Sequence, residues 1–385
     1  TPEPRVNPQP VDCAALPATP KEWQLLTVLV GVQFTHIMDF MVMMPLGPQF
    51  MRIFDITPAQ FGLLVSSYTL TAAVAGFFAA FRLDRYDRKL ALLVLYGCFA
   101  IATLLCALAP GYTFLLLARA VAGAFGGVLN ATIQSFIGDA IAPARRGRAT
   151  GTVAMGFSLA AIAGVPVGLL LANQFGWRAP FFVVAIMAVL IWVAALRVLP
   201  SLRGHVVTGS PVPPLQQLRT MFGERNHVYA VLLAGSLMLG GFSVIPFLSP
   251  YLVGNTGLLE TQLPYVYLAG GLATLVTSRL IGMYADRSGK RHAFAVIALL
   301  SIVPILIVTN LGRLALPWLL TATTFMFVFM SGRYVPAIAL INSSVTPQHR
   351  GSLMSFVSSV QSACSAFAAL AAGHVIERSA SGALL

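Results

Sequence analysis

Residues 285–291 read ADRSGKR, and this run with three basic residues lies between two long apolar stretches of the chain. A related run, LDRYDRK, occupies residues 83–89 and also separates two apolar stretches. A second echo pairs PARRG at 143–147 with PQHRG at 347–351. Both echoes recur at an offset of about 200 residues, which indicates two halves that repeat the same order of helices.

The composition is that of a membrane protein. Of the 385 residues, 57% are hydrophobic and only 9% are charged, whereas a soluble protein carries about 25% charged residues. The net charge of +12 falls between the apolar segments rather than on one face, so we do not expect nucleic acid as a partner. The four cysteines form no C-x-x-C pair, which predicts no disulfide framework and no zinc site. We expect no cofactor.

Eleven apolar segments are long enough to cross a bilayer, which takes roughly 20 residues per helix. They divide the chain into a Pro-rich disordered tail at 1–22, a first bundle at 23–199, a linker at 200–226 and a second bundle at 227–385. The fold class predicted is therefore an all-α membrane protein. The expected spans are 23–46, 59–81, 90–110, 112–138, 150–172, 180–199, 227–252, 263–284, 292–310, 316–341 and 351–373.

Basic residues are distributed unevenly between the two sides of these spans. Eighteen of the 24 Arg and Lys residues fall on the side of the N-terminal tail, four fall on the opposite side, and Arg119 and Arg333 lie within spans. Loops rich in Arg and Lys remain in the cytoplasm. We therefore expect the N-terminus to be cytoplasmic, in a multi-pass protein of the bacterial inner membrane.

The loop repeats resemble the cytoplasmic signature G-x-x-x-D-R-x-G-R/K-R/K of the major facilitator superfamily. The second copy matches fully, and the first copy keeps Asp84, Arg85, Arg88 and Lys89 but has Ala80 and Asp87 at its glycine positions. The resemblance extends from residue 23 to about 373, and within the family it is greatest to the bacterial drug and sugar efflux transporters. The matching residues of the second copy are Gly282, Asp286, Arg287, Gly289, Lys290 and Arg291.

This resemblance implies two parallel six-helix bundles in a monomer that transports a small-molecule substrate by alternating access. The family has twelve spans, so we expect the twelfth to be missing from this sequence. The family also implies that the loop residues form a cytoplasmic latch. An alternative is that they only anchor the loops on the cytoplasmic side. The residues expected to form this latch are Asp84, Arg85, Arg88, Asp139, Gly282, Asp286, Arg287 and Arg291.

Asp39 is the only acidic residue inside a long apolar stretch. A carboxylate in hydrocarbon is costly, so it tends to be paired, solvated in a cavity or protonated. A helix rises 1.5 Å per residue, which places Asp39 and Arg119 at a similar depth, roughly 10–12 Å below the outer surface. The family implies that spans 1, 4, 7 and 10 line the central cavity. We predict proton coupling at Asp39 beside Arg119, with a fixed structural ion pair as the alternative.

Other polar residues of the spans are candidates for the same cavity. His36 precedes Asp39 by three residues on one helical face and is a candidate proton relay or a packing residue. Gln33 and Tyr68 are candidate wall residues. Arg333 has no carboxylate partner in any span, and we expect it either to bind backbone carbonyls beside Pro336 or to hold an anionic group of the substrate.

Two glycine patterns predict close helix packing. In span 4, Arg119 is followed by Gly123 and Gly127 at four-residue spacing, which gives a face of small residues. In span 5, Gly164, Pro166 and Gly168 resemble the family's antiporter motif, although Val165 separates the first glycine from the proline. This motif suggests an efflux transporter that works by antiport.

Two other kinds of function compete with this interpretation. Residues 36–44, HIMDFMVMM, and the Met326–Met330 pair offer thioether and imidazole ligands that suit Cu(I). A non-transporting membrane receptor is the alternative of another class. An enzyme is not expected, because the chain has no H-E-x-x-H, G-x-S-x-G or phosphate-binding sequence.

Overall fold

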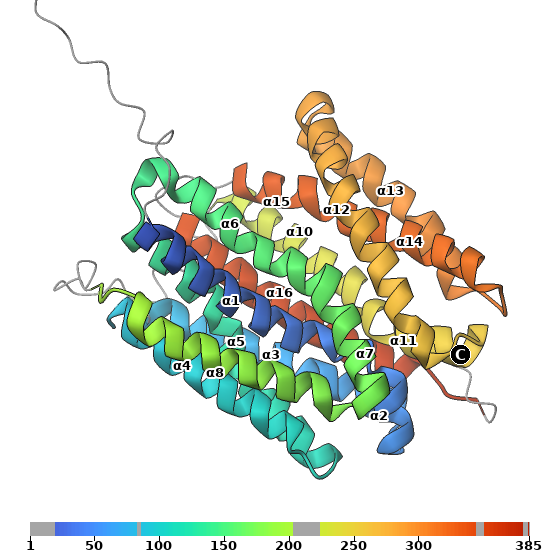
Figure 1. Ribbon diagram of the computed structural model, residues 1–385. Coiled ribbons are helices and arrows are strands. Elements are labelled where there is room, and N and C mark those ends of the chain that lie inside the picture. Colours follow the sequence, from blue (N-terminus) through green and yellow to red (C-terminus); the bar gives the residue numbers. More distant parts are fainter. Residues whose placement is uncertain (1–19, 83–85, 203–223, 344–349, 380–383, 385) are drawn as a thin grey trace, which may run out of the picture.

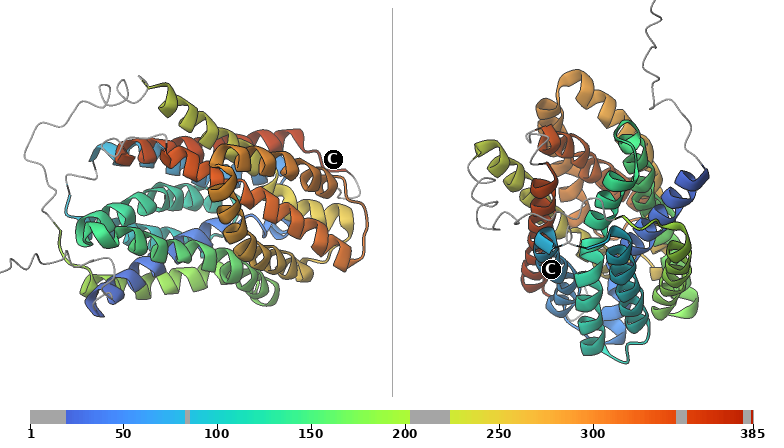
Figure 2. Two further views of the ribbon diagram at one scale, coloured as in Figure 1. Left: turned by 90° about the horizontal axis from the view of Figure 1, so that it is seen from above. Right: turned by 90° about the vertical axis from the view of Figure 1, so that its left-hand side faces the viewer.

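The computed structural model describes residues 20–82, 86–202, 224–343, 350–379 and 384. Almost every described residue is helical, and eleven helical segments are long and apolar enough to cross a membrane. Figures 1 and 2 show these helices running roughly side by side in one elongated bundle. The predicted all-α class and the eleven predicted spans are therefore confirmed.

The described part of the first half contains eight α-helices and one π-helical turn, with short bends between them. The first span is followed by a short helix that the sequence did not lead us to expect, α2, whose residues 47–51 are buried. The elements are α1 (Pro20–Val42), α2 (Gly47–Ile53), α3 (Pro58–Arg82), α4 (Arg88–Ala107), α5 (Tyr112–Ala140), α6 (Arg146–Leu159), the π turn η3 (Ala160–Gly164), α7 (Val165–Phe175) and α8 (Arg178–Val198).

The described part of the second half contains five further spans. Two of its spans are broken, between α10 and α11 and between α14 and α15, as the span of α6 and α7 is in the first half. The elements are α10 (Arg225–Phe242), α11 (Ile245–Thr256), the short turn η4 (Glu260–Gln262), α12 (Leu263–Ser288), α13 (Lys290–Thr309), α14 (Leu316–Gly332), α15 (Tyr334–Ser343) and α16 (Arg350–Val375).

The observed boundaries differ slightly from the predicted ones. Helix α1 begins at Pro20 rather than at residue 23 and ends at Val42 rather than 46. Helix α10 begins at Arg225, two residues before the predicted start of the second bundle. Residues 1–19 of the predicted tail and 203–223 of the predicted linker lie outside the described residues.

The two halves meet where α3 packs against α16. Small residues allow the two backbones to approach closely. A Cβ atom on Gly62 would lie 2.6 Å from the carbonyl oxygen of Ala369, and one on Gly373 would lie 2.8 Å from that of Pro58. The largest hydrophobic core also joins the halves, since Phe61 of the first half and Phe247 of the second belong to it.

The π turn in the fifth span coincides with the glycine–proline motif. The backbone N–H of Val165 bonds to the carbonyl of Ala160, five residues earlier, and Pro166 follows in the first turn of α7. Proline has no N–H to donate, so it disturbs the regular helical hydrogen bonding just before it. The motif therefore lies at a local irregularity of this helix.

The predicted small face of α5 packs against α3. A Cβ on Gly123 would lie 2.2 Å from the carbonyl oxygen of Tyr68, and one on Gly127 would lie 2.4 Å from the Cβ of Ala72. Gly138, on the same helix, has no atom within 4 Å of such a Cβ. Close packing at Gly123 and Gly127 is thus as predicted, and it brings α5 directly against the helix that carries Tyr68.

Gly127→Ala is expected to lower the free energy of unfolding by about 1–3 kcal/mol, because overpacking must push α3 away from α5. Gly138→Ala makes the same change on the same helix in open space and is expected to leave stability unchanged or slightly raised. Thermal unfolding of the two purified variants in detergent measures the difference. Equal melting temperatures for the two would show that the α3–α5 contact is not tight.

Candidate functional site

Asp39 and Arg119 form an ion pair in the interior of the first half. Arg119 Nη1 lies 2.7 Å from Asp39 Oδ2 and also donates to the backbone carbonyl of Asp39 at 3.3 Å. The two side chains are 0% and 1% exposed. Removing both charges from water is costly, and their mutual attraction offsets that cost only in close geometry such as this one.

A tyrosine from α3 completes the surroundings of the arginine. The guanidinium carbon of Arg119 lies 4.5 Å from the ring centroid of Tyr68, within the range of a cation–π interaction. Phe40 packs against this tyrosine, with its ring centroid 5.2 Å from that of Tyr68. Gly126 leaves room for the tyrosine, because a Cβ there would lie 2.2 Å from the Tyr68 hydroxyl. Three helices, α1, α3 and α5, therefore hold Arg119 in place.

The pair does not satisfy all of its polar atoms. Asp39 Oδ1 and Arg119 Nε are buried and have no hydrogen-bond partner among the described residues, and neither has the hydroxyl of Tyr68. Thr103 of α4 lies beside Asp39, but its hydroxyl is likewise unpartnered. Each unpaired buried polar atom is unfavourable. One carboxylate oxygen thus remains available to accept a proton while the other contacts arginine.

His36 and Gln33 lie on α1, within two turns of Asp39 toward the N-terminus. His36 Nδ1 is 3.2 Å from the carbonyl oxygen of Gln33, and both side chains are buried. Gln33 Oε1 has no hydrogen-bond partner among the described residues. Neither side chain bonds to Asp39 or Arg119, so the structure brings these two residues near the pair without joining them to it.

Arg333 lies at the break between α14 and α15, in the second half. Its side chain is half-buried, and its Nε and Nη2 atoms are buried without a partner among the described residues. It makes no described hydrogen bond to the carbonyls beside Pro336, so that expectation is not met. Its Nη2 atom lies 3.7 Å from where a Cβ on Gly240 would be. The structure does not join Arg333 to Asp39 and Arg119.

Two of the residues predicted to form a latch make an ion pair in the first half. Arg88 Nε lies 2.7 Å from Asp139 Oδ2, which joins the start of α4 to the end of α5. Asp87, at the glycine position of the signature, caps α4 by accepting from the backbone N–H groups of Lys89 and Leu90. Asp84 and Arg85 lie outside the described residues.

The second copy of the signature forms the turn from α12 to α13. Gly289 has a φ of +87°, which suits glycine at the sharp bend. The neighbouring charged side chains of the signature are exposed and make no hydrogen bond to another described residue. This applies to Asp286, Arg287 and Arg291, while Gly282 is half-buried in the last turns of α12.

The antiporter-like motif packs against α1 on both sides of Asp39. A Cβ on Gly164 would lie 3.3 Å from Met38 Cγ, and one on Gly168 would lie 2.8 Å from Val42 Cγ2. Pro166 stands between them in the first turn of α7. Movement of this segment would therefore act directly on the part of α1 that carries Asp39.

Sequence reasoning missed two features near the pair. Nothing in the sequence indicated that Thr103 lies near Asp39, because threonine is common in apolar spans. Helix α2 follows the span that carries Asp39 and packs against α3 and α11, whereas the sequence predicts only the end of a span and a loop at 43–51. Among the described residues, no group of three His, Cys, Asp or Glu side chains could hold a metal. Met326 and Met330 pack in the hydrophobic core with Met43 and Met44.

Comparison with known proteins finds a matching family and several relatives of this chain. The model of the Major Facilitator Superfamily matches residues 29–239 and 230–381. The uncharacterized MFS-type transporter YbcL of Bacillus subtilis is 30% identical over 242 residues, which are 63% of this chain and 60% of YbcL. The alignment thus spans less than two thirds of that relative. YceJ of the same species is 25% identical over 333 residues, 84% of this chain and 82% of YceJ.

Another relative has a more specific name. A probable sugar efflux transporter of Helicobacter pylori (strain ATCC 700392 / 26695) is 28% identical over 249 residues, 64% of this chain and 62% of that protein.

Solved structures also resemble the chain. An inward-facing, unoccupied bacterial homolog of the human lysosomal transporter Spinster has a TM-score of 0.71 at 18% identity and covers 90% of this chain and 81% of its own. A D-xylose-proton symporter has a TM-score of 0.68 at 15% identity, over 90% of this chain and 89% of that one. At these identities the structures show a shared fold.

Arg119→Ala is expected to destabilise the protein by about 3–5 kcal/mol, because it leaves Asp39 buried without its cation and removes the support of Tyr68. Arg197→Ala removes the same charge from an exposed position on α8 and serves as the control. Thermal unfolding in detergent compares them. A melting temperature of Arg119→Ala within error of the control would contradict a stabilising role for the pair.

Proposed function

This chain belongs to the Major Facilitator Superfamily, and on that premise we propose that it is a proton-coupled secondary transporter that exports small organic, amphiphilic molecules by antiport. The observation that carries the proposal is the buried Asp39–Arg119 pair with one free carboxylate oxygen. A titratable group at this depth, beside a fixed cation, is a typical carrier of protons across a membrane.

The pair suggests how the proton is gained and lost. While Arg119 is close, its positive charge favours the ionised form of Asp39. When substrate has left and Asp39 moves away from Arg119, loss of the nearby cation favours the protonated form, and Asp39 Oδ1 accepts a proton from the accessible side. The stacked Tyr68 keeps Arg119 in position during this change.

Antiport follows if proton and substrate compete for one site. Substrate bound near Arg119 would release the proton from Asp39, and protonation of Asp39 on the other side would release substrate. The packing of Gly164 and Gly168 against α1 supports this coupling, because a movement of α6 and α7 displaces the residues next to Asp39. Rocking of the two bundles would expose the site alternately to each side.

Arg333 favours a substrate with an anionic group. It is a half-buried cation with two unpartnered nitrogen atoms, and an unpaired charge in the interior of a membrane protein is unfavourable. A carboxylate or phosphate of the substrate would satisfy these donors in the bidentate manner that arginine prefers. The related Helicobacter pylori protein is named a sugar efflux transporter, which is compatible with a small polar cargo.

The setting proposed is the bacterial inner membrane, with the N-terminus in the cytoplasm and the chain acting as a monomer. In this orientation the exit of α1, helix α2 and the start of α12 lie at the outer end of the bundle. Protons enter from that side, and substrate enters from the cytoplasmic side, where the basic loops lie.

We expect Asp39→Asn to abolish substrate-dependent proton flux in vesicles while retaining substrate exchange, because an amide fills the same space beside Arg119 but takes up no proton. Asp55→Asn, an exposed residue beyond α2, is the matched control and should behave like wild type. A pH-sensitive dye inside the vesicles and a radiolabelled substrate measure the two processes. Proton flux in Asp39→Asn equal to wild type would place the coupling elsewhere.

Arg333→Gln should raise the KM for an anionic substrate by about tenfold, the loss of roughly one charge-assisted hydrogen bond, and leave that for a neutral analogue unchanged. Arg333→Lys keeps the charge and should restore part of the affinity. Uptake by inverted vesicles with each member of a matched acid and amide pair measures this. An equal effect on both substrates would mean that Arg333 only supports the fold.

A further inference from the structure

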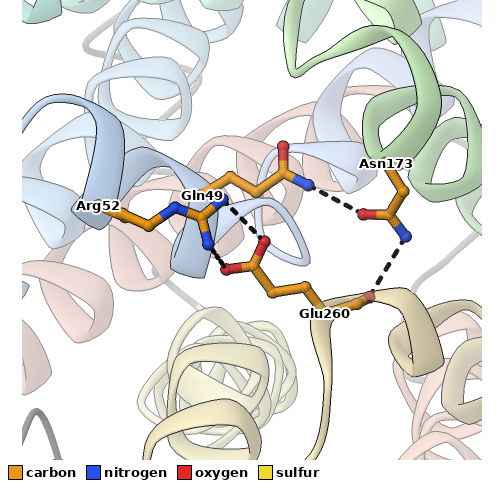
Figure 3. A network of polar contacts seen from close by, with 4 residues as sticks. All are labelled: Gln49, Arg52, Asn173 and Glu260. Atoms are coloured by element: carbon orange, nitrogen blue, oxygen red, sulfur yellow. Dashed lines mark hydrogen bonds and ion pairs between the residues drawn. The ribbon is translucent and has the colours of Figure 1, made fainter.

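Four polar residues join the two halves at the end of the bundle that lies away from the N-terminus (Figure 3). Arg52 Nη1 and Nη2 donate to Glu260 Oε1 and Oε2 at 2.5 and 3.1 Å. Asn173 Nδ2 donates to the carbonyl oxygen of Glu260 at 3.3 Å, and Gln49 Nε2 donates to Asn173 Oδ1 at 3.0 Å. We call Gln49, Arg52, Asn173 and Glu260 the outer clasp.

The outer clasp connects elements from both bundles. Gln49 and Arg52 belong to α2, and Asn173 lies near the end of α7, all in the first half. Glu260 opens the turn η4, directly before α12 of the second half. All three bonds between the halves in this cluster therefore converge on one residue, whose side chain is only 18% exposed. The two-pronged contact of a guanidinium with a carboxylate is the strongest form of this interaction.

An apolar seam lies close to the clasp. Phe61 of α3 and Phe247 of α11 meet edge to face, with centroids 5.9 Å apart. Gly47, at the start of α2, allows a still closer approach, because a Cβ there would lie 2.8 Å from Pro250 Cγ and 2.9 Å from Phe61 Cζ. This end of the bundle is thus closed by a polar layer and an apolar layer together.

Helices on the two sides converge toward the clasp. Helix α12 contacts α7 and the π turn η3, where a Cβ on Gly271 would lie 3.2 Å from the Cα of Ile162. Figure 1 shows α12 and α6 diverging toward their opposite ends, away from the clasp. Exposing Asp39 to the outer side would therefore require Glu260 to leave Arg52 and Asn173.

We propose that the outer clasp is the gate that holds the outer side of the transport path closed in this state, and that its opening is required for protons from outside to reach Asp39. The inference rests on the alternating-access function proposed above. It adds a specific role for Arg52, Glu260, Asn173 and Gln49, which make no bond to the Asp39–Arg119 pair and belong to neither bundle's signature motifs.

The clasp biases the equilibrium and does not lock it. The side chain of Arg52 is 64% exposed, and an ion pair in contact with water contributes little by itself. The apolar seam supplies the rest of the closure and must also separate. A gate of this strength can open in each transport cycle. Loss of the Arg52–Glu260 ion pair is expected to raise the ratio of outward-open to closed molecules by about three- to tenfold.

Charge exchange tests the clasp. Arg52→Glu and Glu260→Arg each place like charges opposite one another, and the double variant Arg52→Glu/Glu260→Arg restores opposite charges in reversed order. Arg313→Glu is the control, because Arg313 is an exposed arginine near the same end with no described ion pair. The readout is the distribution of distances between spin labels on Asp55→Cys and Gly312→Cys, with the four native cysteines replaced by alanine.

Each single exchange is expected to raise the outward-open population about three- to tenfold, and the double exchange to return it to near that of the control. Single variants that match Arg313→Glu, or a double variant that keeps the shift, would overturn the gate. The distances between the spin labels report the conformation of the protein and can be measured without any proton transport. If they shift as expected while wild type shows no coupled proton flux, the clasp stands and the proposed proton coupling fails.

Discussion

The buried contact between Asp39 and Arg119 is the interaction on which the first bundle depends. It places opposite charges of α1 and α5 at 2.7 Å between two fully buried side chains, and Tyr68 of α3 covers the cation. Such a pair is a weak source of stability compared with apolar packing, but removing one partner leaves a charge that nothing else nearby compensates. The close packing of Gly123, Gly126 and Gly127 exists beside it because α3 and α5 must approach closely for Tyr68 to reach Arg119.

The alternation of apolar spans and basic loops along the sequence predicts much of this fold. All eleven spans and the small face of α5 were predictable, because bilayer thickness and backbone hydrogen bonding leave the chain few choices. The pairing of Asp39 with Arg119 was predictable too, since each has few possible partners at its depth.

Other parts of the site were not predictable, for identifiable reasons. Helix α2 is short and apolar, so its residues at 47–51 look like the end of a span. The place of Thr103 beside Asp39 and the contact of Tyr68 with Arg119 depend on helix rotation, which is set by contacts with several neighbours at once. The clasp joins residues 208 positions apart, Arg52 and Glu260, through the docking of the halves, and no local pattern in the sequence encodes that docking.

The contact of Arg119 with the ring of Tyr68 has a consequence for how the protein responds to membrane voltage. Because an arginine stays charged, neutralising Asp39 would change the buried pair from no net charge to a net charge of +1. Any movement of that centre through the membrane field would then involve work of about 2.3 kcal/mol per charge for each 100 mV crossed. The pair has no net charge in this structure, so membrane voltage would not act on it. After protonation of Asp39, the voltage would act on the charge of Arg119, which lies against the ring of Tyr68.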